Sequence, residues 1–210
     1  WHEDLFCPGI FEIPIEKGST VIISAATDAC RGKLEEIWMT ETARRAKEES
    51  KDEKVAEKFE NEEDKIHVRN LVTSGQQFFV NSPSGRPAVI AGYHWFGDWG
   101  RDTLISLPGL TFVSGRSEEG VALLDSIGAY EKNGILPNYF SDDEMENAYN
   151  TVDTSLWYFW AIQQMLKYGG EITFLKNRMW PVMKRILKGY MDGTAFNIYM
   201  GKNGLLHAGD

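Results

Sequence analysis

Cysteine is scarce in this chain of 210 residues, in which only Cys7 and Cys30 occur, and no CxxC pattern is present. Two distant cysteines and four scattered histidines argue against a disulfide framework and against a zinc site built from four Cys and His ligands. The sequence therefore predicts no metal site. Reduced thiols in a cytoplasmic protein fit this composition best.

Basic residues are also few, because 22 Lys and Arg face 31 Asp and Glu, which gives a formal net charge of -9. Nucleic acids and anionic membranes need a basic patch, so the charge argues against both kinds of partner. No apolar run approaches the roughly 20 residues that span a bilayer, and residues 1–5 lack the pattern of a signal peptide. The chain does not begin with methionine, and we expect it to be an excerpt of a longer protein.

The first third of the chain changes character near residue 32. Residues 10–13 and 20–24 are rich in β-branched side chains and flank a turn signal at residues 16–19, which predicts a β-hairpin. Helical periodicity follows, and 17 of the 25 residues from 41 to 65 are charged, ten acidic and seven basic. A stretch this rich in charges of both signs is typical of a solvated helical surface with i,i+4 ion pairs. We interpret it as a linker between domains.

Beyond a loop at residues 82–87, apolar stripes alternate with glycines in a way that predicts paired helices. The expected helices cover residues 101–114, 117–131, 151–168 and 171–191. Residues 196–207 read as strand, turn and strand, in which Asn203-Gly204 favours a type I′ turn. Helices joined by short turns indicate a mainly α protein, an α/α array.

Aromatic and charged side chains gather in one short stretch. Trp95 and Trp99 precede the adjacent pair Arg101 and Asp102. A sugar ring offers an apolar face that stacks on an indole and a rim of hydroxyls that bind guanidinium and carboxylate groups. The stretch therefore predicts a sugar site, although clustered aromatics also occur in ordinary cores.

A second candidate carboxylate, Asp153, stands at the expected start of the helix at residues 151–168, as Asp102 does in its own helix. Taken singly, an acidic residue in a first helical turn is more often a cap than a catalyst. Trp157 and Trp160 lie on the apolar stripe of the same helix, and we favour packing over ligand contact for them.

Residues 91–109, 134–138 and 149–157 together resemble the C-terminal glucosidase region of glycogen debranching enzymes. The resemblance implies an (α/α)6 barrel of the six-hairpin glycosidase type, with its active site at the N-terminal ends of the inner helices. It divides the chain into three parts: residues 1–28 as a β-hairpin that ends a β-sandwich domain, residues 29–68 as the charged helical linker, and residues 69–210 as the N-terminal half of the barrel.

The same resemblance assigns roles. Asp153 matches the general acid of the amylo-α-1,6-glucosidase reaction, and Arg101 with Asp102 matches the pair that grips the terminal glucose of glycogen or a branched α-glucan. Trp95 and Trp99, which the resemblance does not assign, are expected to contact the sugar because an indole can stack on its apolar face. Hydrolysis would need no cofactor and would proceed with inversion, and the general base would be a glutamate outside this chain, so the isolated fragment is expected to be inactive. To act as an acid near neutral pH, Asp153 needs a raised pKa, which an apolar neighbour such as Trp157 could provide.

Three alternatives stay open on the residues alone. A glucoamylase-like or a trehalase-like enzyme would use a similar arginine and aspartate grip. A non-catalytic glucan-binding module would keep the aromatics and tolerate the loss of Asp153.

Half a barrel would also leave apolar helix faces without partners, so we expect the isolated fragment to self-associate.

Overall fold

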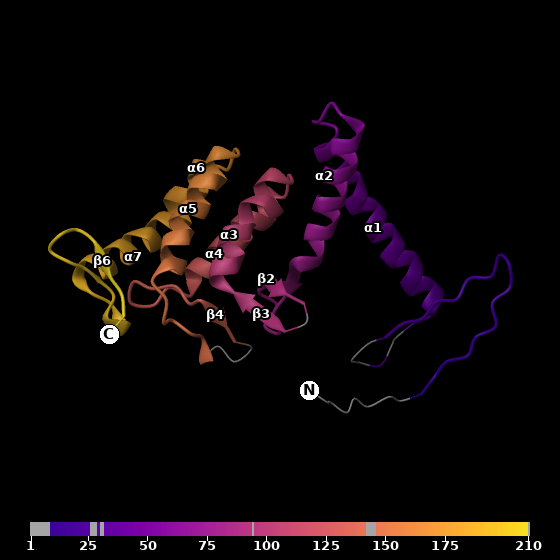
Figure 1. Cartoon of the computed structure of the whole chain (residues 1–210), viewed down its shortest axis with the longest axis horizontal. Helices are drawn as coiled ribbons and strands as arrows, with labels where there is room; N and C mark the ends of the chain where they lie inside the picture. The colour runs from indigo at the N-terminus through magenta and orange to yellow at the C-terminus, as the bar shows by residue number, and fades with distance from the viewer. Residues whose placement is uncertain (1–8, 26–28, 30–31, 94, 142–145, 210) are drawn as a thin grey trace. The chain divides into compact units, whose positions relative to one another are not determined.

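The computed structural model describes residues 9–25, 29, 32–93, 95–141 and 146–209 (Figure 1). Contacts divide the chain into two compact units, Trp1–Glu48 and Glu49–Asp210, and each is described by itself. Helix α1, Leu34–Ala56, begins in the first unit, and its last residues belong to the second. None of the helices among the described residues is long and apolar enough to cross a membrane.

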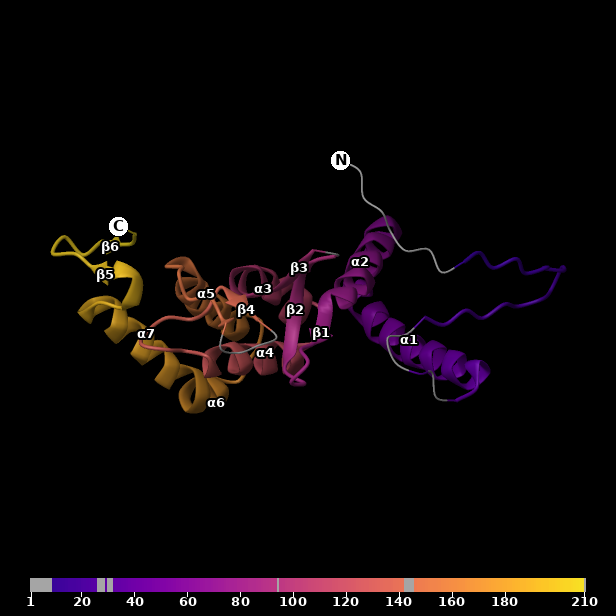
Figure 2. The ribbon, with the colours of Figure 1, turned by 90° about the horizontal axis from the view of Figure 1, so that it is seen from below.

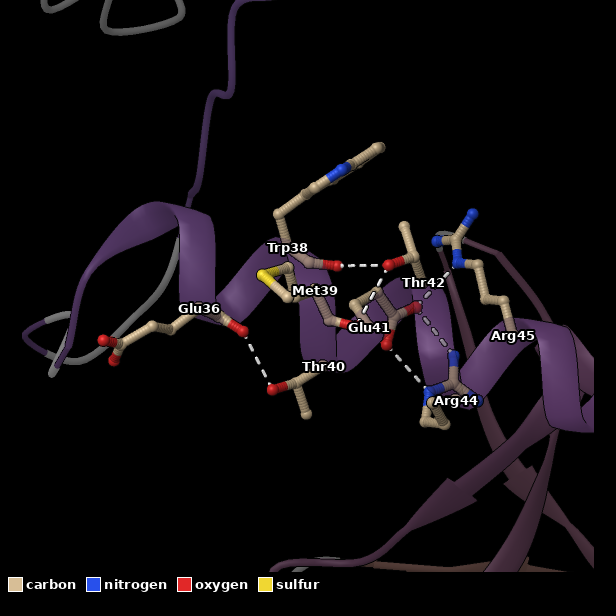
Figure 3. A network of polar contacts seen from close by, with 8 residues as sticks. All are labelled: Glu36, Trp38, Met39, Thr40, Glu41, Thr42, Arg44 and Arg45. Carbon is tan, nitrogen blue, oxygen red and sulfur yellow. Dashed lines mark hydrogen bonds and ion pairs between the residues drawn. The ribbon is translucent and has the colours of Figure 1, made fainter.

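The part of α1 in the first unit has an exposed, charged surface (Figure 3). The Glu41 carboxylate accepts hydrogen bonds from Arg44 and Arg45, one turn further along the helix, at 2.7 to 2.8 Å. The hydrogen bonds from Arg44 and then Arg45 lower the pKa of Glu41 to about 2. The threonines Thr40 and Thr42 each donate a hydroxyl to the carbonyl four residues back. The predicted solvated helix with i,i+4 pairs is thus confirmed for this part of the charged stretch, and its role as a linker stays a prediction.

The predicted β-hairpin before α1 is present only as its turn. Ser19 donates its backbone N–H to the Glu16 carbonyl at 3.0 Å, but residues 9–25 contain no strand. Ile10, Phe11 and Ile23 are exposed by 88%, 84% and 73% in this segment. Two strands alone are marginally stable without a third strand or a packed face, which accounts for the missing ladder. Whether the segment ends a β-sandwich domain stays a prediction.

The second unit opens with a buried carboxylate that sequence patterning did not predict. Asp52, near the end of α1, is only 1% exposed although it lies in the charged stretch. It accepts hydrogen bonds from Thr73 in α2, Glu62–Gly75, at 2.9 Å and from Gln76, just after that helix, at 2.6 Å. Its second oxygen lies 3.4 Å from Arg116. The carboxylate therefore joins three segments of the unit.

A small antiparallel sheet follows α2, with strand order β1-β2-β3-β4 (Figure 2). The strands are β1 Phe79–Asn81, β2 Pro87–Gly92, β3 Phe96–Trp99 and β4 Tyr139–Phe140. Val80 pairs with Ala88 across the loop at residues 82–87, and Trp99 pairs with Tyr139 from a segment forty residues later. Periodicity alone did not reveal these strands, because they are short and their pairing is set by distant residues.

Helices make up the rest of the unit and enclose its core. They are α3 Gly100–Leu107, continued by a wider π-helical segment Pro108–Val113, α4 Ser117–Ala129, α5 Asp153–Lys167, and α6 Ile172–Phe174, continued through Leu175–Met179 into α7 Trp180–Asp192. The four predicted helices are confirmed to within a few residues. Helix α3 packs on α5, and α4 packs on both (Figure 1). Leu104, Leu124 and Tyr158 are fully buried among them.

After α7 the chain forms a short hairpin of β5, Tyr199–Met200, and β6, Leu206–His207. The predicted strands are confirmed, but the turn is not type I′. That turn needs positive φ at two successive residues, whereas only Gly204 has it here, at 76°, and Asn203 does not. The backbone N–H of Gly201 donates to the Leu205 carbonyl at 2.8 Å, which closes a longer loop.

Gly100, where β3 passes directly into α3, stands where a side chain cannot fit. A Cβ there would lie 2.4 Å from the Pro137 carbonyl oxygen and 3.0 Å from the Thr154 methyl group. We expect Gly100→Ala to lower the free energy of unfolding in urea by about 1 to 3 kcal/mol, as overpacking does. Gly109→Ala is the matched control, because a Cβ at Gly109 has nothing within 4 Å and should be tolerated. An unchanged urea midpoint for Gly100→Ala would show that the segment at Pro137 moves aside.

Candidate active site

The first residues of α3 and α5 meet at one place, and Asn138 holds them together. The Asn138 side-chain oxygen accepts a hydrogen bond from the Thr154 hydroxyl at 3.0 Å and from the Arg101 backbone N–H at 3.3 Å. Its backbone carbonyl accepts the N–H of Gly100 at 2.8 Å. One residue just before β4 thus fixes the starts of both helices, whose N-terminal ends carry partial positive charge.

This arrangement brings Arg101 against Asp153. Nη2 of Arg101 donates to Oδ1 of Asp153 at 2.8 Å, and Nε lies 2.7 Å from Oδ2. The Thr151 hydroxyl donates to the same Oδ1 at 2.6 Å and accepts from Arg101 Nη2 at 3.2 Å. Arg101 and Asp153 are 42% and 36% exposed, so the pair is open to solvent on one side. The Nη2 contact is a charge-assisted hydrogen bond, which is strong and directional, whereas Nε is close to Oδ2 without making a hydrogen bond.

The Arg101 contact decides the protonation of Asp153. Partial burial acts to raise the pKa of Asp153, but the hydrogen bonds from Arg101 and Thr151 and the charge of Arg101 outweigh burial, so the pKa lies below its ordinary value. The expected raised pKa is therefore wrong for this structure. Trp157, the expected cause, packs edge-on against Trp160 at the margin of the core, 5.3 Å between ring centroids, and does not line the site.

An open cavity of about 710 Å³ lies beside the pair. One wall is polar and comes from Arg101 and residues 150–153 at the start of α5. The other comes from the segment 196–198 after α7 and from residues 208–209 after β6. Sequence reasoning did not find this second wall. Its sequence signal is weak, because only the folded chain brings residues some 45 positions apart together.

The other predicted site residues, all within the described chain, do not line this cavity. Asp102 is exposed in the first turn of α3, beside Arg101 in sequence. The guanidinium group of Arg101 contacts Asp153 and not Asp102. Trp95 is 86% exposed in the turn between β2 and β3. Trp99 is partly buried and tilts against Tyr139, 5.3 Å between ring centroids. The structure thus joins Arg101 to Asp153 and leaves the three others outside.

Asp98, in the same aromatic stretch, serves the sheet instead. Its carboxylate pairs with Arg86, and both side chains are 12% exposed. The Arg86 guanidinium lies 4.3 Å from the centroid of the Phe140 ring. Burial raises the pKa of Asp98, and the charge and hydrogen bond of Arg86 reduce that effect without cancelling it. This carboxylate is therefore a structural partner of Arg86.

His94, in the aromatic stretch, and the acidic residues at positions 142–144 lie outside the described residues. Among the described residues, no three His, Cys, Asp or Glu side chains are grouped so that they could hold a metal ion. The polar and aromatic side chains among the described residues that line the cavity are thus one carboxylate, one guanidinium, one hydroxyl, two amides and one phenylalanine ring.

Comparison with known protein families adds one finding to this geometry. The family model described as amylo-alpha-1,6-glucosidase matches residues 73–210. The match covers the sheet, the helices from α3 onward and both walls of the cavity.

Proposed function

The chain belongs to the amylo-alpha-1,6-glucosidase family, that of the C-terminal region of glycogen debranching enzymes, and from this we propose that the cavity beside Arg101 and Asp153 hydrolyses α-1,6-linked glucose at glycogen branch stubs. The observation that carries the proposal is the open cavity with this pair on its wall, inside the matched residues. In this proposal the reaction uses no cofactor and takes place in the cytoplasm.

In the proposed reaction Asp153 is the general acid. Its proton passes to the glycosidic oxygen, the bond from C1 to that oxygen breaks, and water attacks C1 from the opposite face with inversion. Water must lose a proton to a base, roughly 6.5 to 9.5 Å from the acid in inverting enzymes. Asp153 is the only carboxylate among the described residues that line the cavity. As the family resemblance implies, we propose that the base is a glutamate outside this chain, so the isolated chain would be inactive.

The low pKa of Asp153 requires a second step. Arg101 has to leave Asp153 before that carboxyl can carry a proton near neutral pH. Vicinal hydroxyls of glucose can accept hydrogen bonds from a guanidinium group. We therefore propose that Arg101 exchanges its hydrogen bond to Asp153 for hydrogen bonds to the terminal glucose. The bound sugar also excludes water from Asp153, which raises its pKa. Substrate binding would thereby prepare the acid.

Asp102, Trp95 and Trp99 remain proposed glucose contacts. Asp102 is exposed in the first turn of α3, next to Arg101 in sequence, and we propose that it binds the same terminal glucose. Trp95 presents an exposed indole in the turn between β2 and β3. The self-association expected of the isolated chain also stays a prediction.

One observation favours the binding-module alternative. A carboxylate held ionised by arginine resembles a structural ion pair more than a poised acid. In that case the cavity would bind a glucan without cleaving it, and Arg101 would never leave Asp153.

The test is glucose release by the full-length parent protein. The substrate is phosphorylase limit dextrin pretreated with a glucanotransferase, so that single α-1,6-linked glucose units remain. We expect glucose from this substrate and little from trehalose or linear maltooligosaccharides. Preferential cleavage of trehalose or of linear chains would favour the trehalase-like or glucoamylase-like enzyme. Glucan binding without any glucose release would favour the binding module.

A further inference from the structure

The segment between α7 and β5 forms a tight, pinned loop at the edge of the cavity. Thr194 donates its backbone N–H to the Ile198 carbonyl at 2.8 Å, and its hydroxyl lies within hydrogen-bond distance of the Ala195 and Ile198 carbonyls, at 2.8 and 3.0 Å. Ile198 itself is 3% exposed and belongs to the core. The three residues between these anchors, 195–197, are thus held in one conformation.

Phe196 and Asn197 within this loop have strained backbones. Their φ angles are 61° and 54°, in the left-handed region. Asparagine tolerates this region, but a bulky residue such as phenylalanine adopts it rarely and at a free-energy penalty. Burial does not offset the penalty, because Phe196 is 56% exposed. Packing within this chain therefore does not account for the strained backbone of Phe196.

Asn197 fixes the strained conformation from its other side. Its Nδ2 donates to the Gly209 carbonyl at 2.9 Å and lies 3.4 Å from Nε2 of His207 on β6. The loop is therefore connected to α7 at its start, to the core at Ile198 and to the end of the hairpin. Residues in rare conformations persist where the surrounding structure determines them in this way, and such places cluster at ligand sites.

The lining of the cavity at this loop suits a carbohydrate. Phe196 and Asn197 line the cavity whose other wall carries Arg101, Thr151 and Asp153. An exposed apolar ring, an amide and a charged pair around an open volume of about 710 Å³ match the apolar face and hydroxyl rim of a pyranose. The volume lies in the range of small-molecule binding sites, and it leaves space for more than the one sugar unit that would contact Arg101 and Asp153.

We propose that Phe196 is the stacking platform of a second sugar subsite, which binds the glucose unit of the main glucan chain to which the scissile α-1,6-linked glucose is attached. This inference rests on the proposed function. A 1,6 linkage contains one more rotatable bond than a 1,4 linkage, so the second ring is loosely oriented unless the protein holds it. A rigid platform supplies that orientation, and it would select branch stubs over linear chain ends.

The experiment uses the full-length protein and two substrates. Treated limit dextrin has the second ring, whereas α-glucosyl fluoride has a single ring and a leaving group that needs little protonation. We expect Phe196→Gly to lower kcat/KM on the dextrin roughly tenfold, the loss of about one aromatic contact, and to lower it much less on the fluoride. Because glycine adopts positive φ freely, the same change should leave the melting temperature equal or higher. Phe196→Tyr keeps the ring and should retain activity on both substrates.

Phe174→Ala is the matched control, since Phe174 is an exposed phenylalanine on α6 that does not line the cavity. It should change neither rate. Equal losses on both substrates for Phe196→Gly, or no loss on either, would overturn the second subsite and leave the proposed function standing. Release of glucose from neither substrate by the unmodified protein would instead reject the proposed function, and the subsite with it.

Discussion

Replacing Asp153 by asparagine is expected to slow glucose release from branch stubs by about 10² to 10⁴-fold, the range that a positioned general acid contributes. Asparagine keeps the shape of the side chain but has no acidic proton for the leaving oxygen. Its amide oxygen can still accept the hydrogen bonds that Thr151 and Arg101 donate to Oδ1 at 2.6 and 2.8 Å. The fold should therefore survive, and glucan affinity should change little.

The control for Asp153→Asn is Asp125→Asn. Asp125, on α4, also pairs with an arginine, Arg178, but at the surface and away from the cavity. The Asp125→Asn change removes one negative charge from a comparable ion pair, and it should leave turnover unchanged. A further comparison uses α-glucosyl fluoride, whose leaving group requires little protonation, so Asp153→Asn should be impaired far less on it than on the dextrin. Undiminished turnover on the dextrin would remove the general-acid assignment.

Local patterns predicted the helical frame of the site well. Apolar stripes and their glycine boundaries placed the helices from α3 to α7, and both Asp102 and Asp153 lie in first turns as expected. These features depend on neighbours three or four residues apart, which a sequence displays directly. The starts of the helices could therefore be predicted from the amino-acid sequence alone.

The partners of charged groups could not be predicted in the same way. Adjacency in sequence suggested that Arg101 would act with Asp102, whereas the fold turns it to Asp153, 52 residues away. Asp52 lies in a stretch that reads as solvated, yet it is buried because Thr73, Gln76 and Arg116 converge on it. Long-range pairing of this kind follows from topology, and so does the second wall of the cavity at Phe196.

Arg101 is proposed to contact Asp153 in the free protein and the substrate in the complex. This change of partner leads to a prediction for the pH dependence of activity and for the variant Arg101→Gln. In the free protein, Arg101 holds the pKa of Asp153 below its ordinary value. A general acid works only while protonated, so activity falls as the pH rises through its pKa. The basic limb of kcat/KM, which reports the free enzyme, should therefore lie at lower pH than the basic limb of kcat, which reports the complex in which glucose has taken over Arg101.

Glutamine has no charge, so Arg101→Gln should raise the pKa of Asp153 in the free protein. The basic limb of kcat/KM should then move to higher pH and approach that of kcat. Loss of the grip on glucose should also lower kcat/KM by roughly 10 to 100-fold, the value of a charged hydrogen bond. Arg178→Gln, which breaks the surface pair with Asp125, should shift neither limb. If the two limbs already coincide in the unmodified protein, Arg101 does not change partners during the reaction.

Stability against pH gives a reading of the same pair that does not depend on catalysis. A carboxylate whose folded pKa is depressed stabilises the folded state above its unfolded pKa, near 4, and this contribution is lost as the pH falls through the folded value. The difference in unfolding free energy between the unmodified protein and Arg101→Gln should therefore be present at pH 7 and shrink below about pH 4. Because Arg101 and Asp153 are 42% and 36% exposed, the difference should also shrink at high salt. A difference that does not vary with pH would mean that Arg101 stabilises the fold through contacts other than Asp153, and the proposed release of the acid would lose its basis.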